Sequence, residues 1–331
     1  MRSGLVLACG SLIGVIAVAD VAAQTASTGS GQAYPLKPVR IIIPTPAGGN
    51  PDFIARPVAQ KMSESLKQVF IIDNRPGAAG TIGVELATRA VPDGYTLLFG
   101  AIGHIATPPA LYEKLSYDAT RDLIAISEIA DAPFALFVHP SLPARSVREL
   151  VALATARPGQ ITYASFGVGS YTHFATEALN SATGVKMVHV PYKGSAPAAT
   201  ALLGGEVMAS FDALQSTLQY VRAKRLRALA IGSPQRAKVA PEIMTFAEAG
   251  FPNVTASAWF GLFAPANTPR DIVMRLHGEA VKAVAAPDIR DHFERAGIEP
   301  IGSTPEQFAQ LVRSDIAMFS KIARAAGIRA E

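Results

Sequence analysis

VRIIIPTPAGGN, residues 39–50, decides the fold class of this chain. Its β-branched run, Val39–Pro44, is typical of a buried strand, and the turn after it leads into apolar side chains at helical spacing over Pro51–Leu66. Asn50 is a good N-cap, and Pro51 fits the first helical position. A strand that passes through a tight turn into a helix predicts a parallel α/β sheet.

The alternation of strands and helices continues along the chain. Further strands are expected at Val69–Asp73 and Tyr95–Phe99, with a helix at Thr81–Ala90 between them. The pattern then restarts, with strands expected at Phe134–Val138, Ile161–Ser165, Lys186–Val190, Val207–Phe211 and Leu226–Ile231, and helices at Ser146–Ala156, Tyr171–Ser181, Ser195–Leu203 and Leu214–Ala223. This order favours two doubly wound α/β units.

The last stretch contains three expected helices and little sheet. The helices are expected at Asp271–Ala285, Ile289–Ala296 and Pro305–Ala326, with a short strand at Glu299–Ile301. This is too little sheet for a third domain, so we expect the C-terminal helices to pack back on the first unit.

The composition limits the classes of protein to which the chain can belong. Its 331 residues are 49% hydrophobic and 17% charged, which suits a folded two-domain protein and not a disordered one. One cysteine and six histidines leave no material for a zinc ribbon or a disulfide framework. The net charge is +4 and no basic run extends beyond Arg222–Arg227, so nucleic acid is not expected as a partner.

Residues 1–23 are expected to be a secretory signal peptide. A basic residue precedes an apolar or small run from Gly4 to Ala19, and Val21-Ala22-Ala23 has the small-x-small form of a cleavage site. An uncleaved anchor is the alternative, but the run is shorter than the ~20 residues of a spanning helix. Cleavage after Ala23 removes Cys9, leaves residues 24–33 as a disordered lead, and sends the mature chain to the periplasm.

Two α/β units predict a ligand cleft between them, and ligands of such folds bind beyond the carboxyl ends of the strands. The first turn at such an end contains Ala47, Gly48 and Gly49. A helix N-terminus carries unpaired N–H groups and a positive dipole end, so this turn can hold an anion. An ordinary tight turn is the alternative, and no Gly-Lys-Ser/Thr follows that would make it a P-loop.

A second glycine turn, Ser165–Ser170, again joins a strand to a helix. It contains Gly167 and Gly169, and Ser170 is the expected N-cap of the helix. The sixth position of the glycine pattern is Thr172, so a dinucleotide site is not indicated.

Four further polar residues lie at or near strand ends. His173 either points into the cleft or packs; it shares a helix face with Glu177, but no third ligand accompanies the pair, so no metal is expected. Tyr192 and Lys193 precede a helix, and Lys193 is the only cation at such a turn, although a solvated surface lysine is the commoner case. Asp212 can cap the next helix or hydrogen-bond a ligand.

The sequence offers little for catalysis. It has no Gly-x-Ser-x-Gly elbow, no cysteine in the expected mature chain, and no pair of carboxylates at strand ends with apolar flanks. His173 with Asp212 is the only couple that a hydrolase on this fold could use. We therefore expect a binding protein, with no catalytic residue, metal or cofactor.

A set of short motifs runs in order from Tyr34 toward the C-terminus. It comprises Tyr34–Arg40 (YPLKPVR), Pro46–Gly49 (PAGG) with Asp52 and Arg56, Asn74–Gly80 (NRPGAAG), Pro92–Leu98 (PDGYTLL), Leu111-Tyr112 with Tyr117-Asp118, Val138–Ser141 (VHPS), Val190–Gly194 (VPYKG), Glu248–Gly250 (EAG), Trp259-x-Gly261-Leu262 and Ala264-Pro265. Together these motifs resemble the substrate-binding proteins of tripartite tricarboxylate transporters, the TctC-like or Bug family.

The resemblance implies the α/β class and a type II periplasmic-binding-protein fold, with two α/β domains flanking a ligand cleft. It implies residues 34–132 and 255–331 as domain 1 and residues 133–254 as domain 2. The implied ligand is a small organic acid (a di- or tricarboxylate, an acidic amino acid or an aromatic carboxylate), held largely by backbone N–H groups and bridging waters.

Carried over by position, the resemblance assigns Ala47, Gly48, Gly49, Asp52, Gly167, Gly169, Ser170, His173 and Asp212 to the ligand site. Asn50, Tyr192 and Lys193 join them from their places in the turns. Thr45 stands where the family usually has an aromatic residue, Asn50 where it usually has serine or threonine, and Pro108 where it often has asparagine. These departures leave the expected fold in place and the identity of the solute open.

The expected function is that of a periplasmic solute-binding protein, a monomer, that delivers a small carboxylate to the subunits of a membrane transporter. Closure of the two lobes on the solute would shift an equilibrium between open and closed forms. A sensor that presents its ligand to a membrane receptor kinase is one alternative, and a periplasmic hydrolase on the same fold is another.

Overall fold

The computed structural model describes Met1 and residues 34–329. The expected signal peptide and the lead of residues 24–33 lie, apart from Met1, outside the described residues. Within the described part of the chain, none of the helices is both long enough and apolar enough to cross a membrane. Pro35–Glu331 forms a single compact unit.

The first group of strands is parallel. It consists of β1 (Val39–Ile43), β2 (Phe70–Asn74) and β3 (Thr96–Ala101), connected through α1 (Asn50–Leu66), the short helix η1 (Ala78–Gly80) and α2 (Thr81–Thr88). β1 lies in the middle, with Ile41 in register with Ile72 of β2 and Leu97 of β3. Ile41 is buried because helices and strands cover both faces of such a sheet. The predicted β-α-β-α-β order is confirmed here.

The second group repeats this arrangement. Its strands are β5 (Thr162–Ser165), β6 (Val188–Pro191), β7 (Ala209–Ala213) and β8 (Arg227–Ile231), and its helices are α6 (Val147–Ala156), α7 (Tyr171–Thr183), α8 (Ser195–Gly204) and α9 (Leu214–Arg222). β5 lies between β6 and β7, and these three strands are parallel. The predicted elements of this group are therefore confirmed in order, with boundaries that move by at most two residues.

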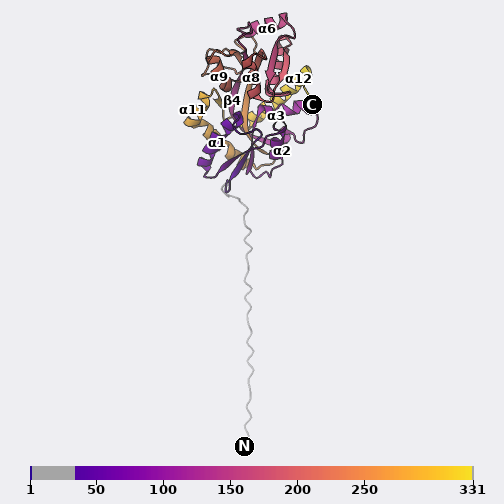
Figure 1. Cartoon of the computed structure of the whole chain (residues 1–331). Helices are drawn as coiled ribbons and strands as arrows, with labels where there is room; N and C mark the ends of the chain where they lie inside the picture. Colours follow the sequence, from indigo (N-terminus) through magenta and orange to yellow (C-terminus); the bar gives the residue numbers. More distant parts are fainter. Residues whose placement is uncertain (2–33, 330–331) are drawn as a thin grey trace. The chain divides into compact units, whose positions relative to one another are not determined.

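Two long antiparallel strands join the groups, β4 (Leu123–Val138) and β9 (Ser257–Pro265). The strand order is β2-β1-β3-β9-β4-β7-β5-β6, and β8 and β10 (Glu299–Pro300) also pair with β4. The first part of β4 pairs with β9, whereas its end pairs with β7 and β8. Figure 1 shows β4 between α1 and α2 of the first group and α6, α8 and α9 of the second. The expectation of a purely parallel sheet was therefore wrong for the centre of the molecule. Only the last five residues of β4 were predicted as strand, and β9 was not predicted.

The C-terminal helices are α10 (Arg270–Ala285), α11 (Pro287–Arg295) and α12 (Pro305–Ala326). α10 and α11 contact α1, and α12 contacts the short helices α3 (Ile102–Ile105) and α4 (Pro108–Leu111). These contacts confirm that the C-terminal helices pack on the first group of strands and helices. α12 also contacts α7 of the second group.

The start of α1 differs from the expectation. Gly49, with an extended backbone, is the N-cap, whereas Asn50 lies inside the helix and no side chain caps it. The expected N-cap role of Asn50 was therefore wrong, because the helix begins one residue earlier than expected, with Asn50 already inside it and the extended Gly49 before it. By contrast, Ser170 is the N-cap of α7 as predicted, and its hydroxyl accepts the N–H of His173.

Candidate functional site

The first turn, between β1 and α1, is held in shape by the buried carboxylate of Asp52. Its oxygens accept the N–H of Gly48 at 3.0 Å and the Nε and Nη2 groups of Arg56 at 2.7 and 2.9 Å. The Asn74 amide donates to Asp52 Oδ1 at 3.1 Å and to the Thr45 carbonyl at 3.0 Å. Burial acts to raise the pKa of Asp52, but the hydrogen bonds from Arg56, Gly48 and Asn74 lower it overall. Asp52 therefore positions the turn, and its carboxylate oxygens already accept hydrogen bonds from groups of the chain itself.

Gly48 allows the sharp path of this turn. Its φ is +85°, and an added Cβ would meet nothing within 4 Å, so the backbone conformation and not crowding requires glycine here. Since the Gly48 N–H group binds Asp52, the amide groups that remain for a solute are those of Gly49, Asn50 and the first turn of α1.

The second turn, between β5 and α7, is also bound by the chain's own side chains. The Ser165 hydroxyl accepts the N–H of Gly167 at 3.1 Å and contacts the Gly167 carbonyl at 3.0 Å. The N–H of Gly169 donates to Nδ1 of His173 at 3.1 Å, and the Phe166 N–H donates to the Thr172 hydroxyl at 3.0 Å. The two predicted glycines therefore shape this turn, and the donors that remain for a solute lie at the start of α7.

His173 packs beneath this turn. Its ring is 7% exposed and stacks on His189, with 3.8 Å between the ring centroids. The Tyr163 ring lies beside both imidazoles, with its centroid 5.0 Å from that of His189 and 6.3 Å from that of His173, and its hydroxyl donates to Glu177 at 2.7 Å. Burial and then the neighbouring His189 lower the pKa of His173 to about 4. Because the neutral ring accepts at Nδ1, its proton lies on Nε2.

The burial of the neutral His173 ring predicts that the stability of the protein depends on pH. The unfolded ring protonates near pH 6.5 and the folded ring only near pH 4, so the contribution of His173 to stability is complete above 6.5 and is lost as the pH falls toward 4. We expect the free energy of unfolding to lose about 3 kcal/mol from this group over that range. Denaturant unfolding of wild type and His173→Gln at several pH values measures the difference.

The comparison with His173→Gln is needed because buried carboxylates change the pH dependence of stability in the opposite direction from His173. Burial raises the pKa of Glu128 to about 8 and of Asp131 to about 7, so these groups destabilise the fold as the pH rises. His292→Gln, which changes an exposed ring, is the matched control. An identical pH profile for wild type and His173→Gln would show that the ring is not held neutral by the fold.

The third turn, between β6 and α8, lies against the second. The N–H of Tyr192 donates to the Ser165 carbonyl at 3.0 Å, and the Gly194 N–H donates to the Phe166 carbonyl at 3.2 Å. Lys193 is exposed, and its ammonium group forms no ion pair within residues 34–329. The structure therefore brings the predicted residues of the second and third turns together and leaves Lys193 with its charge available.

Asp212 lies at the end of β7, beside the same turns. It is 3% exposed and accepts the N–H of Ala213 at 2.7 Å, with the hydroxyls of Ser195 and Ser216 at 3.4 Å. Burial raises the pKa of Asp212 to about 7 in spite of these hydrogen bonds. Among the described residues, Asp212 and His173 do not hydrogen-bond to each other.

The segment of α3 and α4 connects the two sets of turns. In the first group, the ring of His104 lies against Gly80, where an added Cβ would be 2.6 Å from the ring and 3.3 Å from the Pro44 carbonyl. Toward the second group, Leu111 packs on Gly169, where an added Cβ would be 2.4 Å from the leucine side chain. α3 and α4 therefore contact the end of β1 and the second turn together.

Three residues with buried, unpartnered polar atoms lie at strand ends, and sequence reasoning did not assign them to the site. Thr45 Oγ1 follows β1, His104 Nδ1 follows β3, and both amide atoms of Gln215 follow β7. A buried polar atom without a partner is costly, so each of these groups is a candidate to meet a solute or a water. Their position directly after a buried strand was the signal available in the sequence.

The comparisons with known proteins identify the family of the chain. Residues 54–328 match the family model described as the tripartite tricarboxylate transporter family receptor. The chain belongs to this family. The curated protein BugT of Bordetella pertussis is 34% identical over 319 residues, which are 96% of this chain and 98% of BugT.

Two solved structures of similar proteins contain dicarboxylates. Rpa4515 of R. palustris, described with adipate, is 34% identical, with a TM-score of 0.80 and coverage of 90% of this chain and 100% of that chain. MatC of Rhodopseudomonas palustris, described with bound malate, is 29% identical, with a TM-score of 0.76 and coverage of 87% and 99%. The α/β fold with two lobes that the resemblance implied is thereby confirmed.

Proposed function

We propose that this protein is a periplasmic receptor that captures a small dicarboxylate between its two lobes and delivers it to a membrane transporter. The observation that carries the proposal is the assembly of the second and third turns with Asp212, in contact with α4 of the first group through Leu111 and Gly169. This arrangement gathers the N-termini of α7 and α8 at one place. Helix N-termini attract carboxylates through their unpaired N–H groups and dipoles.

The charges at these turns suit an anionic solute. Lys193 offers an ammonium group that no carboxylate of the described residues neutralises. Asp212, buried and with its pKa raised to about 7, is partly protonated near neutrality and repels an anion less than an ordinary carboxylate would. We propose that Gly49, Asn50, Ser170, Tyr192 and Lys193 contact the solute, and that Gly48, Asp52, Gly167, Gly169 and His173 hold the turns in position.

We propose residues 34–132 with 255–331 as one lobe and residues 133–254 as the other. The pairing of β4 supports this division, because Pro133 is the last residue of β4 in register with β9, and Phe134 is the first in register with β7. The bridge between Gly232 and Ala256 marks the return crossing. A pair of closely spaced crossings allows the lobes to rotate about a hinge.

The remaining parts of the proposal concern location and activity. The signal-like first residues support export to the periplasm. The separation of His173 from Asp212 in the hydrogen-bond network supports binding without catalysis. We propose a monomer that works with transporter subunits in the membrane.

The test is a panel of carboxylates against the ligand-stripped mature chain. Adipate, malate, succinate, citrate, aspartate and terephthalate, each with its amide counterpart, are compared by thermal shift and calorimetry. A dicarboxylate at about a hundred times its Kd should add about 2.7 kcal/mol to the free energy of unfolding. We expect one class of dicarboxylate to bind and its amides not to bind.

Two variants connect binding to this site. Lys193→Ala removes the uncompensated charge, and Gln215→Leu removes an unpartnered amide at the end of β7; each is expected to weaken binding about tenfold. Lys186→Ala is the control. Lys186 is exposed and precedes β6, whereas the candidate turns follow the ends of the strands, so this variant should bind solute normally. Failure of all the acids to bind a folded sample would refute the proposed function.

A further inference from the structure

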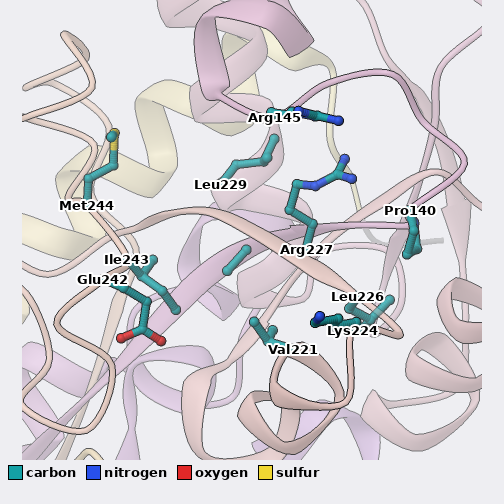
Figure 2. A pocket seen from close by; sticks show the side chains of 11 residues that line it. Pro140, Arg145, Val221, Lys224, Leu226, Arg227, Leu229, Glu242, Ile243 and Met244 are labelled. Carbon is teal, nitrogen blue, oxygen red and sulfur yellow. The ribbon is translucent and has the colours of Figure 1, made fainter.

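A basic pocket lies on the second group, along the edge strand β8. Its cavity of about 430 Å³ is lined by Arg145, Lys224, Arg227 and Glu242 together with apolar residues of β8 and the segment before Thr245. Three cations therefore face one carboxylate. In Figure 2 the Arg227 side chain extends toward the Arg145 end of the pocket, and the Glu242 carboxylate lies at the other end. The pocket is thus polarised, with its positive charge at one end.

The cations around this pocket are held by neutral partners. Nη1 of Arg227 donates to the carbonyls of Leu142 and Ala144 at 3.3 and 2.7 Å, and Nη2 of Arg222 donates to the Val239 carbonyl at 3.1 Å. A carbonyl fixes a guanidinium group without neutralising its charge.

Arg225, in the turn before β8, also has an uncharged partner. Arg225 lies over the ring of Tyr220, 5.8 Å from its centroid. Within residues 34–329, none of Arg145, Arg222, Lys224, Arg225 and Arg227 forms an ion pair. The three cations that line the pocket, Arg145, Lys224 and Arg227, thus keep charge that an outside partner can compensate.

The floor of the pocket is apolar. Leu226, Leu229 and Ile243 are buried there, and Met244 is 37% exposed at the rim. An apolar centre surrounded by charged groups is typical of the energetic core of a protein–protein contact. A small hydrophilic anion would leave this floor unused.

The pocket is separate from the turns of the candidate site. Arg227 is in register with Val138, whereas the end of β7 at Ala213 is in register with Phe134. Four residues along a strand correspond to about 13 Å. A change at the pocket should therefore leave solute binding intact.

We propose that this pocket is the docking site for an acidic segment of the membrane transporter, one that inserts an apolar side chain between carboxylates. The proposal rests on the proposed function, because it requires a membrane partner. Electrostatic complementarity of this kind speeds encounter and selects the partner, and it weakens as salt rises.

The test uses the mature chain with Arg145→Glu and Lys224→Glu combined. Both side chains are exposed, so the fold should tolerate the change. The control combines Lys186→Glu and Arg313→Glu, which are exposed, unpaired within the described residues and equal in charge change. Uptake of the solute found in the panel is measured in proteoliposomes that contain the membrane subunits, as a function of receptor concentration.

We expect the pocket variant to need about ten times more receptor for half-maximal uptake, with an unchanged Kd for the solute, and the control to behave like wild type. A second probe, the labelled peptide acetyl-Glu-Glu-Leu-Glu-Glu-amide, should bind wild type more tightly than its glutamine counterpart. Its affinity should fall when ionic strength rises from about 0.02 M to about 0.2 M.

Three results would overturn the docking proposal. One is normal uptake with the pocket variant. Another is equal binding of the acidic and glutamine peptides. The third is displacement of the acidic peptide by phosphate or citrate at concentrations below those of the peptide itself, which would make the pocket a site for small anions. A wild-type chain that binds no solute refutes the proposed function instead, and the panel detects that result independently.

Discussion

Replacing Asp52 with alanine is expected to lower both the stability of the protein and its affinity for solute. The carboxylate accepts hydrogen bonds from Gly48, Arg56 and Asn74, and its removal leaves the Gly48 N–H without its acceptor, while Asn74 keeps only the Thr45 carbonyl. We expect the free energy of unfolding to fall by about 2–4 kcal/mol. Solute affinity should fall about a hundredfold, because the Gly48 turn loses its anchor.

Urea unfolding and calorimetry with the best acid of the panel measure these two effects. Asp52→Asn keeps an acceptor for the Gly48 N–H but loses the ion pair, so its stability should lie between wild type and Asp52→Ala. Asp288→Ala is the matched control, since that carboxylate pairs with Lys61 at 2.9 Å but is 61% exposed, so its loss should change stability far less. Equal midpoints for Asp52→Ala and Asp288→Ala would contradict the role assigned to Asp52.

Replacing Gly232 with alanine is expected to disrupt the crossing between the two groups. Gly232 donates its N–H to the Phe134 carbonyl at 2.8 Å, and its carbonyl accepts the Ala256 N–H at 3.1 Å. An added Cβ would lie 2.3 Å from the Ala256 nitrogen and 2.4 Å from its Cα. Since backbone atoms cannot rotate away as a side chain does, we expect a loss of about 3 kcal/mol in the free energy of unfolding.

Gly278→Ala provides the contrast for this prediction. Gly278 lies within α10, and an added Cβ there would meet nothing within 4 Å. The same glycine-to-alanine change should therefore stabilise the protein by about 0.5–1 kcal/mol, since alanine is the better helix former. Thermal unfolding of the two variants measures the difference. Tm shifts in the same direction for Gly232→Ala and Gly278→Ala would contradict the prediction that only Gly232 has no room for a Cβ.

Local signals in the sequence predicted the helices and short strands well. Ser146 and Ser170 are N-caps as expected, and Gly184 and Gly205 end α7 and α8 in the left-handed conformation. Such signals work because a cap or a turn depends on residues within one helical turn of each other. The misassigned cap at Asn50 shows the limit, because the helix begins at Asn50 itself, with Gly49 as a cap that has no side chain.

The sequence predicted where the turns lie better than it predicted the contacts of their side chains. The twelve expected residues lie in these turns, in the first turns of α1 and α7 or, for Asp212, at the end of β7, and those of the second and third turns come together. However, the side chains of Asp52 and His173 accept hydrogen bonds from within the chain, from the N–H groups of Gly48 and Gly169. Which atom a side chain contacts depends on the path of the turn, and the residue type alone does not specify that path.

The sequence by itself determined the order of strands and helices, the turns at strand ends and the family, since each of these depends on neighbours along the chain. Only the tertiary structure decided the central crossing of β4 and β9, in which the side chains of Asp131 and Ser257 hydrogen-bond across a separation of 126 residues. Bulges near Ser127 and Ile129 interrupt the alternation that would have revealed β4, and its partner lies too far along the chain for any local pattern to indicate. The same reason explains why His173 and His189 stack and why Arg145, Lys224 and Arg227 line one pocket, because both depend on which distant segments the fold brings together.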